Sequence, residues 1–164
     1  SKINIVRKNN LHISLKFLGN LNYLEIEKTW LVLQKISFKC QPFQVKISKN
    51  IGIFSSRKIP RVIWVGLEEG IKEIREIYGA IEHELAQESF WRNEKNITPH
   101  ITIGRIKYLK NPNKFIDFLN NIKIPEISQS IQSMELMESQ LTSQGPIYTV
   151  KSKFPFFLIE DTTS

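Results

Sequence analysis

Two short stretches of the sequence repeat one arrangement of residue types. In "LHISLKF" apolar residues alternate with His12 and Ser14, and in "PHITIGR" they alternate with His100 and Thr102. Alternation with a period of two is typical of a β-strand, in which successive side chains point to opposite faces. Each stretch therefore predicts a strand with a histidine and a hydroxyl group on one face and apolar side chains on the other.

The elements predicted around these strands follow the same order in both halves of the chain. Apolar residues at helical spacing or in alternation predict helices at 23–36, 70–90 and 111–122 and strands at 43–54, 61–69, 130–141 and 145–156. In each half a histidine strand is followed by a helix and two strands. This order predicts an internal repeat of the architecture, with a pseudo-symmetric arrangement of the two halves.

Length and composition favour a single domain. A chain of 164 residues with 41% apolar residues can bury one sizeable core, and no linker divides it, so we expect one domain over 1–164. No apolar run approaches the roughly 20 residues of a membrane-spanning helix. The single cysteine, Cys40, cannot form an internal disulfide, and we expect a cytoplasmic protein without membrane association. An excess of 23 Lys and Arg over 16 Asp and Glu favours anionic partners such as RNA or nucleotides.

The two histidine motifs have several chemical interpretations. A single histidine usually has a structural or surface role, and we assign His83, which lacks a hydroxyl residue two positions later, to the surface. Zinc ligation by His12 and His100 is a weaker alternative, because a structural site needs four ligands and a catalytic site three, and no further ligand recurs at suitable spacing. Nucleophilic catalysis by Ser14 is another alternative, although it leaves Thr102 without a role.

Acid and base catalysis at phosphorus fits the paired motifs best. Imidazole changes its charge near neutral pH, so one ring can accept a proton while the other donates one. Displacement at phosphorus needs such groups on opposite sides, one at the attacking water and one at the leaving oxygen. Ser14 and Thr102 follow the histidines at the spacing that lets their hydroxyls donate hydrogen bonds to the non-bridging phosphate oxygens. The motifs therefore predict His12 and His100 as a catalytic pair.

These motifs resemble those of a known family. "NLHISLKFLG" and "PHITIGR" resemble the paired His-x-Thr/Ser motifs of the two-histidine phosphoesterase superfamily. With "RVIWVGL" and "LTSQGPIYTV" added, the chain resembles its RNA 2′,3′-cyclic phosphodiesterase branch, also called 2′-5′ RNA ligase. The resemblance implies a bilobed α+β fold, in which two antiparallel sheets with outer helices surround a central cleft that holds both motifs.

The same resemblance implies an activity. Members open a 2′,3′-cyclic phosphate at an RNA 3′ end to leave a 2′-phosphate, without a metal or another cofactor, and some also join RNA ends reversibly through a 2′-5′ bond. By motif match, His12 and His100 are catalytic, while Ser14 and Thr102 bind phosphate. The resemblance favours His100 as the base and His12 as the acid, although the sequence alone does not order them. We expect a hydrolase whose partner is RNA with a cyclic phosphate end or a cyclic nucleotide. The alternative is a nucleotide- or RNA-binding module without catalysis.

Further candidates for substrate binding are Lys16, Arg105, Arg61 and Tyr148. Lys16 shares the polar face of the first motif. Arg105 follows a glycine whose flexibility would turn the guanidinium towards phosphate. Arg61 and Tyr148 carry planar groups that can stack on a base. The aromatic residues Phe17 and Trp64 are expected to pack in the core.

The beginning of the chain differs from the family pattern. Family members have an apolar strand and a helix ahead of the first motif, whereas only "KINIV" leads up to it here. We therefore expect this chain to lack that strand and helix. It would then be a truncated, less stable monomer, or a protein that fills the vacant position beside its sheet by forming a dimer.

Overall fold

The computed structural model describes residues 1–57, 59–92, 97–143 and 145–157. The chain divides into two compact units. The first comprises residues 1–15, 45–72 and 98–129, and the second comprises residues 16–44, 73–97 and 130–164. His12, Ser14, His100 and Thr102 all belong to the first unit.

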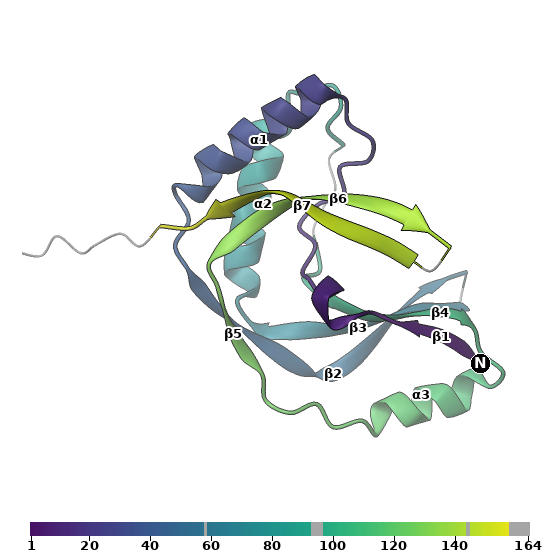
Figure 1. Ribbon diagram of the computed structural model, residues 1–164. Helices are drawn as coiled ribbons and strands as arrows, with labels where there is room; N and C mark the ends of the chain where they lie inside the picture. The colour runs from purple at the N-terminus through teal and green to yellow at the C-terminus, as the bar shows by residue number, and fades with distance from the viewer. Residues whose placement is uncertain (58, 93–96, 144, 158–164) are drawn as a thin grey trace, which may run out of the picture. The chain divides into compact units, whose positions relative to one another are not determined.

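A five-stranded sheet forms the frame of the first unit (Figure 1). Its strands are β1 (Lys2–Ile5), β2 (Phe43–Ser56), β3 (Ile59–Glu69), β4 (Ile101–Tyr108) and β5 (Ser128–Ile131). They lie in the order β1-β4-β3-β2-β5, and the pairs β1–β4, β4–β3 and β3–β2 are antiparallel. The sequence predicted β2, β3 and β4, but it did not indicate β5 as a separate strand.

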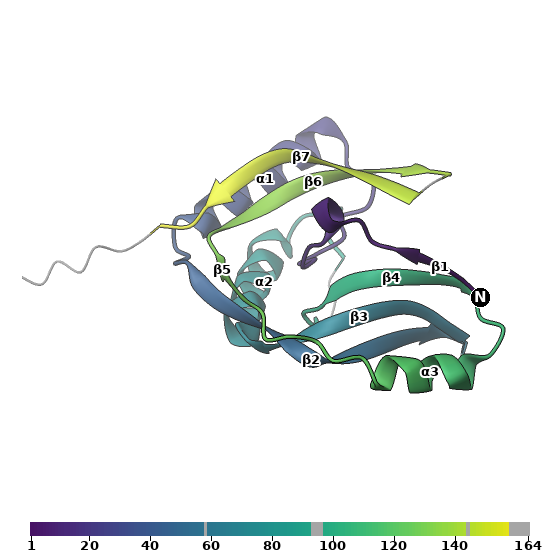
Figure 2. The same ribbon diagram turned by 60° about the horizontal axis from the view of Figure 1, so that its bottom comes forward.

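Helix α3 (Pro112–Asn120) packs on one face of this sheet (Figure 2). The side chain of Asn111 accepts a hydrogen bond from the backbone N of Lys114 in the first turn. Pro112 suits the start of the helix because a backbone N–H at that position would have no partner within the helix. The buried Leu119 packs in one cluster with Ile63 of β3 and Ile106 of β4. This face is the core of the first unit, so the opposite face is left for the polar side chains of the strands.

The second unit contains two helices and a β-hairpin. Its elements are α1 (Tyr23–Ser37), α2 (Ile71–Leu85), which begins in the first unit, β6 (Ser133–Thr142) and β7 (Gly145–Pro155). β6 and β7 pair antiparallel, and α1 contacts both strands. All four elements were predicted from the sequence, and the α+β class with antiparallel sheets is confirmed. None of the helices in the described part of the chain is both long and apolar enough to span a bilayer.

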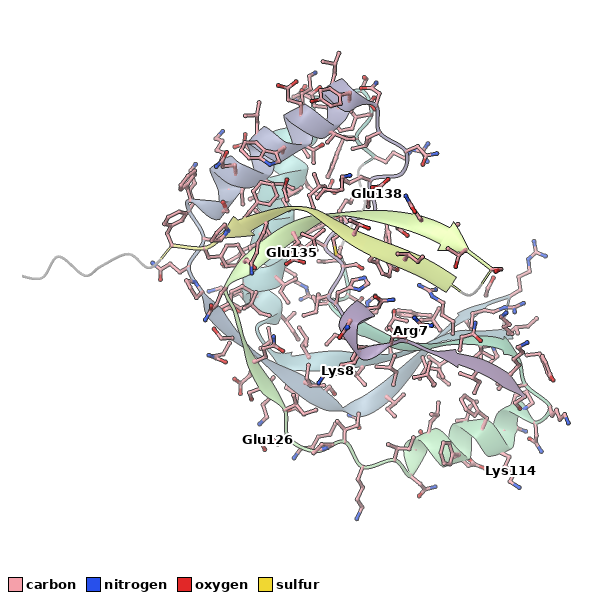
Figure 3. The ribbon with its side chains drawn as sticks, viewed as in Figure 1. Arg7, Lys8, Lys114, Glu126, Glu135 and Glu138 are labelled. Atoms are coloured by element: carbon pink, nitrogen blue, oxygen red, sulfur yellow. The ribbon has the colours of Figure 1, made fainter. Side chains whose placement is uncertain are left out.

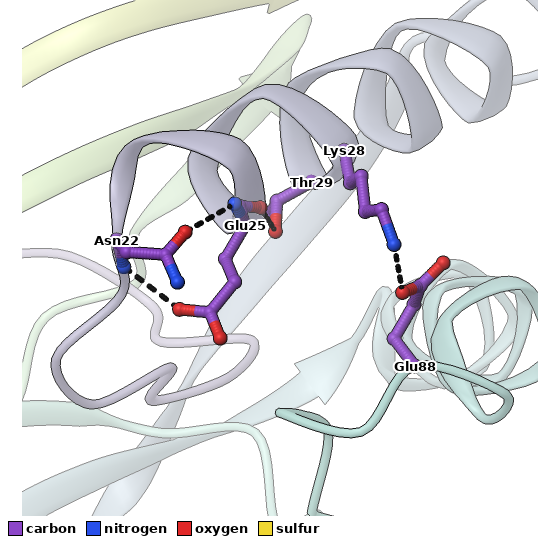
Figure 4. Close-up of polar contacts among 5 residues, drawn as sticks. All are labelled: Asn22, Glu25, Lys28, Thr29 and Glu88. Atoms are coloured by element: carbon purple, nitrogen blue, oxygen red, sulfur yellow. Dashed lines mark hydrogen bonds and ion pairs between the residues drawn. The ribbon is translucent and has the colours of Figure 1, made fainter.

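Polar contacts fix the start of α1 and connect it to the chain that follows α2 (Figure 4). The Oδ1 of Asn22 accepts a hydrogen bond from the backbone N of Glu25 at 3.0 Å, and the Oε2 of Glu25 accepts one from the backbone N of Asn22 at 2.7 Å. This capping box satisfies two donors that a helix start leaves unpaired. The Nζ of Lys28 lies 2.6 Å from the Oε2 of Glu88, an ion pair that ties the two helical segments of the second unit together.

The first histidine motif is not the regular strand that its alternation predicted. Residues 11–17 form only one isolated antiparallel bridge, between Ile13 and Ile101 of β4. Leu11 and Phe17 are 44% and 73% exposed, so the core position expected for Phe17 is wrong. The reason is that Ile13 is the motif's sole bridge to β4, and the chain enters the second unit at Lys16.

Candidate active site

The rings of His12 and His100 make the same local contact. The Nδ1 of His12 lies 2.6 Å from the carbonyl oxygen of Asn10, and the Nδ1 of His100 lies 2.7 Å from that of Thr98. A carbonyl oxygen only accepts hydrogen bonds, so each contact places a proton on Nδ1. In the neutral ring Nε2 is then the nitrogen that can accept a proton, and in the charged ring it is the nitrogen that can donate one. In both histidines Nε2 is therefore the ring nitrogen that these backbone contacts leave available.

The backbone before each histidine presents these carbonyl groups. A short 3-10 helix, η1 (Lys8–Asn10), precedes His12, and Arg7 and Lys8 at its start are labelled in Figure 3. This turn ends at Asn10, whose carbonyl oxygen faces the ring two residues later. Before His100 the buried Pro99 favours an extended conformation for the residue ahead of it, Thr98, which accepts the second bond. A 3-10 helix before His12 and an irregular segment before His100 thus produce the same Nδ1 contact.

The bridge between Ile13 and Ile101 brings the two motifs side by side. In an antiparallel pair the residues flanking a bridge face each other, so His12 lies opposite Thr102 and Ser14 lies opposite His100. Their side chains project to the side of the pair away from the two isoleucines. Each histidine therefore has the hydroxyl group of the other motif as its cross-strand neighbour. The sequence predicted the two His-x-hydroxyl motifs but not this exchanged pairing.

A β-bulge places Arg105 on the same face as Thr102. β4 pairs with β3 so that Thr102 is opposite Trp64 and Arg105 is opposite Val62, and the register shifts between these pairs. Three steps along β4 correspond to only two along β3, which leaves Ile103 as the extra residue. Trp64 and Val62 share a face because they are two apart, and so Thr102 and Arg105 share it as well.

The expected role of Gly104 is wrong. We expected its flexibility to turn Arg105, but its φ is not among the positive values, which the described glycines reach at Gly19, Gly70 and Gly145. Gly104 is buried on the core face, where a Cβ atom would lie 3.2 Å from the Cδ1 of Ile63. The glycine permits close packing, and the bulge sets the direction of the arginine.

An aromatic cluster lies against His100. The rings of Phe54 on β2 and Trp64 on β3 are stacked, with centroids 4.8 Å apart and planes at 22°. The imidazole of His100 meets both edgewise, at 4.9 Å and 83° from Phe54 and at 5.8 Å and 63° from Trp64. Trp64 is half-buried and lies outside the isoleucine and leucine cluster of the core. The core role expected for Trp64 is therefore wrong, since it belongs to the histidine face.

Lys16 has an internal partner in the second unit. Its side chain is 5% exposed, and its Nζ lies 2.9 Å from the Oε1 of Glu82 and 4.8 Å from the ring centroid of Trp91. It also donates a hydrogen bond to the carbonyl oxygen of Arg92. Burial raises the pKa of Glu82, but hydrogen bonds from Lys16, Trp91 and Tyr78 and the charge of Lys16 outweigh it and hold that pKa below its usual value. The pair fixes the chain just after the first motif.

The other predicted residues lie elsewhere. Arg61 alternates with Val62 on β3 and so belongs to the face opposite Thr102, where its Nη1 donates to the carbonyl oxygen of Lys107 at 3.3 Å. Tyr148 lies on β7 in the second unit, opposite Ser139. His83 is exposed on α2, which confirms its assignment to the surface. The described residues include no group of three or more His, Cys, Asp or Glu placed to hold a metal ion.

Sequence reasoning missed the residues that support the histidines. The carbonyl groups of Asn10 and Thr98 carry no signal in the sequence, because every residue has one. Phe54 and Gly52 follow the alternation of β2, which does not tell a core face from a functional one. The signal for this face was the polar pair His100 and Thr102 in the second motif, and β3 lies between the strand of that motif and β2.

Comparison with known proteins identifies the family of the chain. The family model described as "AKAP7 2′5′ RNA ligase-like domain" matches residues 2–152. An RNA 2′,3′-cyclic phosphodiesterase of Aquifex aeolicus (strain VF5) is 34% identical over 152 residues, which cover 91% of this chain and 79% of the relative. A protein of the same name from Methanocaldococcus jannaschii is 33% identical over 149 residues, covering 90% and 82% of the two chains.

Solved structures show the same fold. A crystal structure of a protein from Thermus thermophilus matches with a TM-score of 0.72 and 26% identity, covering 94% of this chain and 82% of that one. The structure of E. coli LigT complexed with 3′-AMP matches with a TM-score of 0.70 at 20% identity, covering 94% and 81%, and supports the fold alone. The family model and the sequence relatives decide the family. The chain belongs to the 2′-5′ RNA ligase-like family, which includes the RNA 2′,3′-cyclic phosphodiesterases.

Proposed function

We propose that this protein hydrolyses the 2′,3′-cyclic phosphate at the 3′ end of RNA to a 2′-phosphate, with His12 and His100 as general acid and general base. The observation that carries the proposal is the pair of imidazoles whose Nδ1 atoms are both held by backbone carbonyl groups. This arrangement supports proton transfer through Nε2 of each ring. A module that only bound RNA would not need both rings prepared in this way.

The reaction needs one neutral and one protonated ring. The neutral imidazole, assigned to His100 by the family resemblance, accepts a proton at Nε2 from the attacking water as the new P–O bond forms. The P–O3′ bond breaks on the other side of phosphorus, and the imidazolium of His12 donates its Nε2 proton to the departing O3′. The product has a 2′-phosphate and a 3′-hydroxyl, and the two rings have exchanged protonation states.

Hydroxyl and guanidinium groups complete the site. Ser14 and Thr102, each opposite the histidine of the other motif, donate hydrogen bonds to the non-bridging phosphate oxygens. Arg105 lies on the same face as Thr102. Its positive charge stabilises the negative charge on the non-bridging phosphate oxygens in the transition state. The role follows from the bulge at Ile103, without which the guanidinium would point into the core face.

The identity of the product tests the proposal. RNA with a 2′,3′-cyclic phosphate end is incubated with the protein in the presence and absence of a metal chelator, and the position of the phosphate is determined. We expect a 2′-phosphate at the same rate in both. A 3′-phosphate, or activity lost with the chelator, would contradict the proposed chemistry. Ligation through a 2′-5′ bond, the cytoplasmic location and the monomeric state stay predictions from the sequence.

A further inference from the structure

The ring of His100 is held from two sides. It lies immediately before β4, and its Nδ1 contact with Thr98 fixes one atom of the ring. One hydrogen bond leaves a ring free to pivot about the bonded atom. The edgewise contacts with Phe54 and Trp64, at 4.9 and 5.8 Å, restrict that pivot and so determine where Nε2 points.

The strand beneath the aromatic pair is shaped for it. Gly52 on β2 lies directly opposite Trp64 on β3. A Cβ atom at Gly52 would lie 2.3 Å from both Cε2 and Cζ2 of the indole, so any other residue would push the ring away. The glycine therefore lets the indole lie flat over the backbone, in the position from which it supports Phe54.

No hydrogen bond within the described part of the chain holds the indole in this position. Its Nε1 is buried and has no partner among the described residues. A buried donor without a partner is unfavourable and uncommon in folded proteins. The ring contacts of Trp64 with Phe54 and His100 are the favourable interactions that offset this unpaired donor.

We propose that Phe54 is a positioning residue, which, supported by Trp64 over Gly52, holds the His100 ring so that Nε2 stays directed at the reacting water. This inference rests on the proposed role of His100 as general base. Phe54 is 38% exposed, more than a core residue would be. Its position at the surface of the histidine face also admits a different role, stacking on a substrate base, which the experiment distinguishes.

The kinetic test compares Phe54→Leu with Phe54→Tyr, using 2′,3′-cyclic AMP as substrate. Leucine keeps the apolar bulk but removes the ring, and we expect kcat to fall about three- to ten-fold with KM unchanged, because the group affected acts in the chemical step. Tyrosine keeps the ring contact and retains kcat near that of the wild type. Gly52→Ala, which displaces the indole, lowers kcat in the same direction as Phe54→Leu.

A matched control comes from the second unit. Phe38 is 58% exposed and stacks on Phe157 with centroids 4.9 Å apart, so Phe38→Leu removes a similar aromatic contact in the unit that does not contain His12 or His100. It leaves kcat and KM unchanged. A rise in KM for Phe54→Leu at constant kcat would overturn the positioning role and indicate base stacking instead. No change in either constant would also overturn it.

A spectroscopic measurement tests the contact without using activity. The chain has three histidines, so ring-labelled protein gives three Cε1–H cross-peaks in a ¹H–¹³C spectrum, one for each imidazole. Loss of the neighbouring ring in Phe54→Leu shifts the His100 cross-peak, while that of the exposed His83 stays in place. An unmoved His100 cross-peak would refute the inference. Full activity in His100→Ala would contradict the proposed function itself. Loss of activity in His100→Ala together with an unchanged kcat in Phe54→Leu would reject only the positioning role of Phe54.

Discussion

Arg105 lies on the same face of the sheet as Thr102. The two residues are three positions apart on β4, and in a regular strand that spacing places side chains on opposite faces. The cause is the shift in register between the β3 pairs of these two residues, which leaves Ile103 as an extra residue. The guanidinium of Arg105 therefore lies on the face that carries His100 and Thr102, and on the same strand as Thr102. This relationship separates Arg105 from Arg61, the two arginines that the sequence had offered as candidates for substrate binding.

Replacing Arg105 weakens catalysis much more than replacing Arg61. Arg105→Ala removes the guanidinium from the histidine face, and kcat/KM falls about 10- to 100-fold, the effect of one or two charge-assisted hydrogen bonds. Arg61→Ala changes an exposed arginine on the opposite face and leaves kcat/KM within about two-fold. Steady-state kinetics on a cyclic nucleotide measures both. Equal losses in the two variants would show that Arg105 has no special place at the site.

The rate of hydrolysis passes through a maximum as pH is varied. One imidazole must be neutral and the other protonated, so the reaction slows at acidic pH, where both rings are charged, and at alkaline pH, where both are neutral. A rate that rises steadily to alkaline pH would point to hydroxide as the nucleophile without general acid catalysis.

The ion pair of Lys16 and Glu82 makes stability depend on pH. Because the pKa of Glu82 is lowered in the folded protein, its contribution is fully present above the ordinary value of 4.5 and is lost as pH falls through the lowered pKa. Glu82→Gln leaves Lys16, whose side chain is 5% exposed, without its carboxylate, and we expect the free energy of unfolding at pH 7 to fall by about 3 kcal/mol.

The matched control for Glu82 is Glu84. It pairs with Lys35 at 2.7 Å, with the lysine side chain 55% exposed. Glu84→Gln alters stability little, because exposed pairs are screened by solvent. Denaturant unfolding of both variants at pH 7 and pH 3 provides the comparison. A deficit of Glu82→Gln that was as large at pH 3 as at pH 7 would mean that the carboxylate charge is not its cause.

Binding of RNA weakens as salt concentration rises. The formal net charge of +7 and the cations near the first motif, Arg7 and Lys8, favour a chain of phosphates over a mononucleotide. Neutralised phosphates release counterions, so the logarithm of the binding constant falls linearly with the logarithm of salt concentration. Equal affinity for a cyclic mononucleotide and for RNA with the same end would argue against contacts beyond the terminal nucleotide.

The sequence predicted the helices and hairpins well because their signals are local. The spacing of Ile74, Ile77 and Ile81 defines α2, and the alternation of β6 and β7 defines their hairpin. The motif around His12 was predicted as a strand but forms only one bridge. Alternation of apolar and polar residues shows which residues suit a strand, but it does not show whether a partner strand continues beside them.

The site was predictable in its residues but not in its geometry. His-x-hydroxyl motifs can be found in a sequence, and their recurrence indicated a pair. The register that exchanges their partners, the bulge at Ile103 and the ion pair of Lys16 arise from contacts between distant segments. Such contacts depend on tertiary packing, for which a single sequence has no local signal.

The central claim is that His12 and His100 transfer the protons of the reaction, and turnover of single alanine variants tests it most directly. The account predicts that His12→Ala and His100→Ala each lose about 10²- to 10⁴-fold in kcat on a 2′,3′-cyclic phosphate substrate. His83→Ala, which changes the exposed histidine of α2, retains the wild-type rate. Turnover near the wild-type rate in either His12→Ala or His100→Ala, in folded protein, would contradict the account.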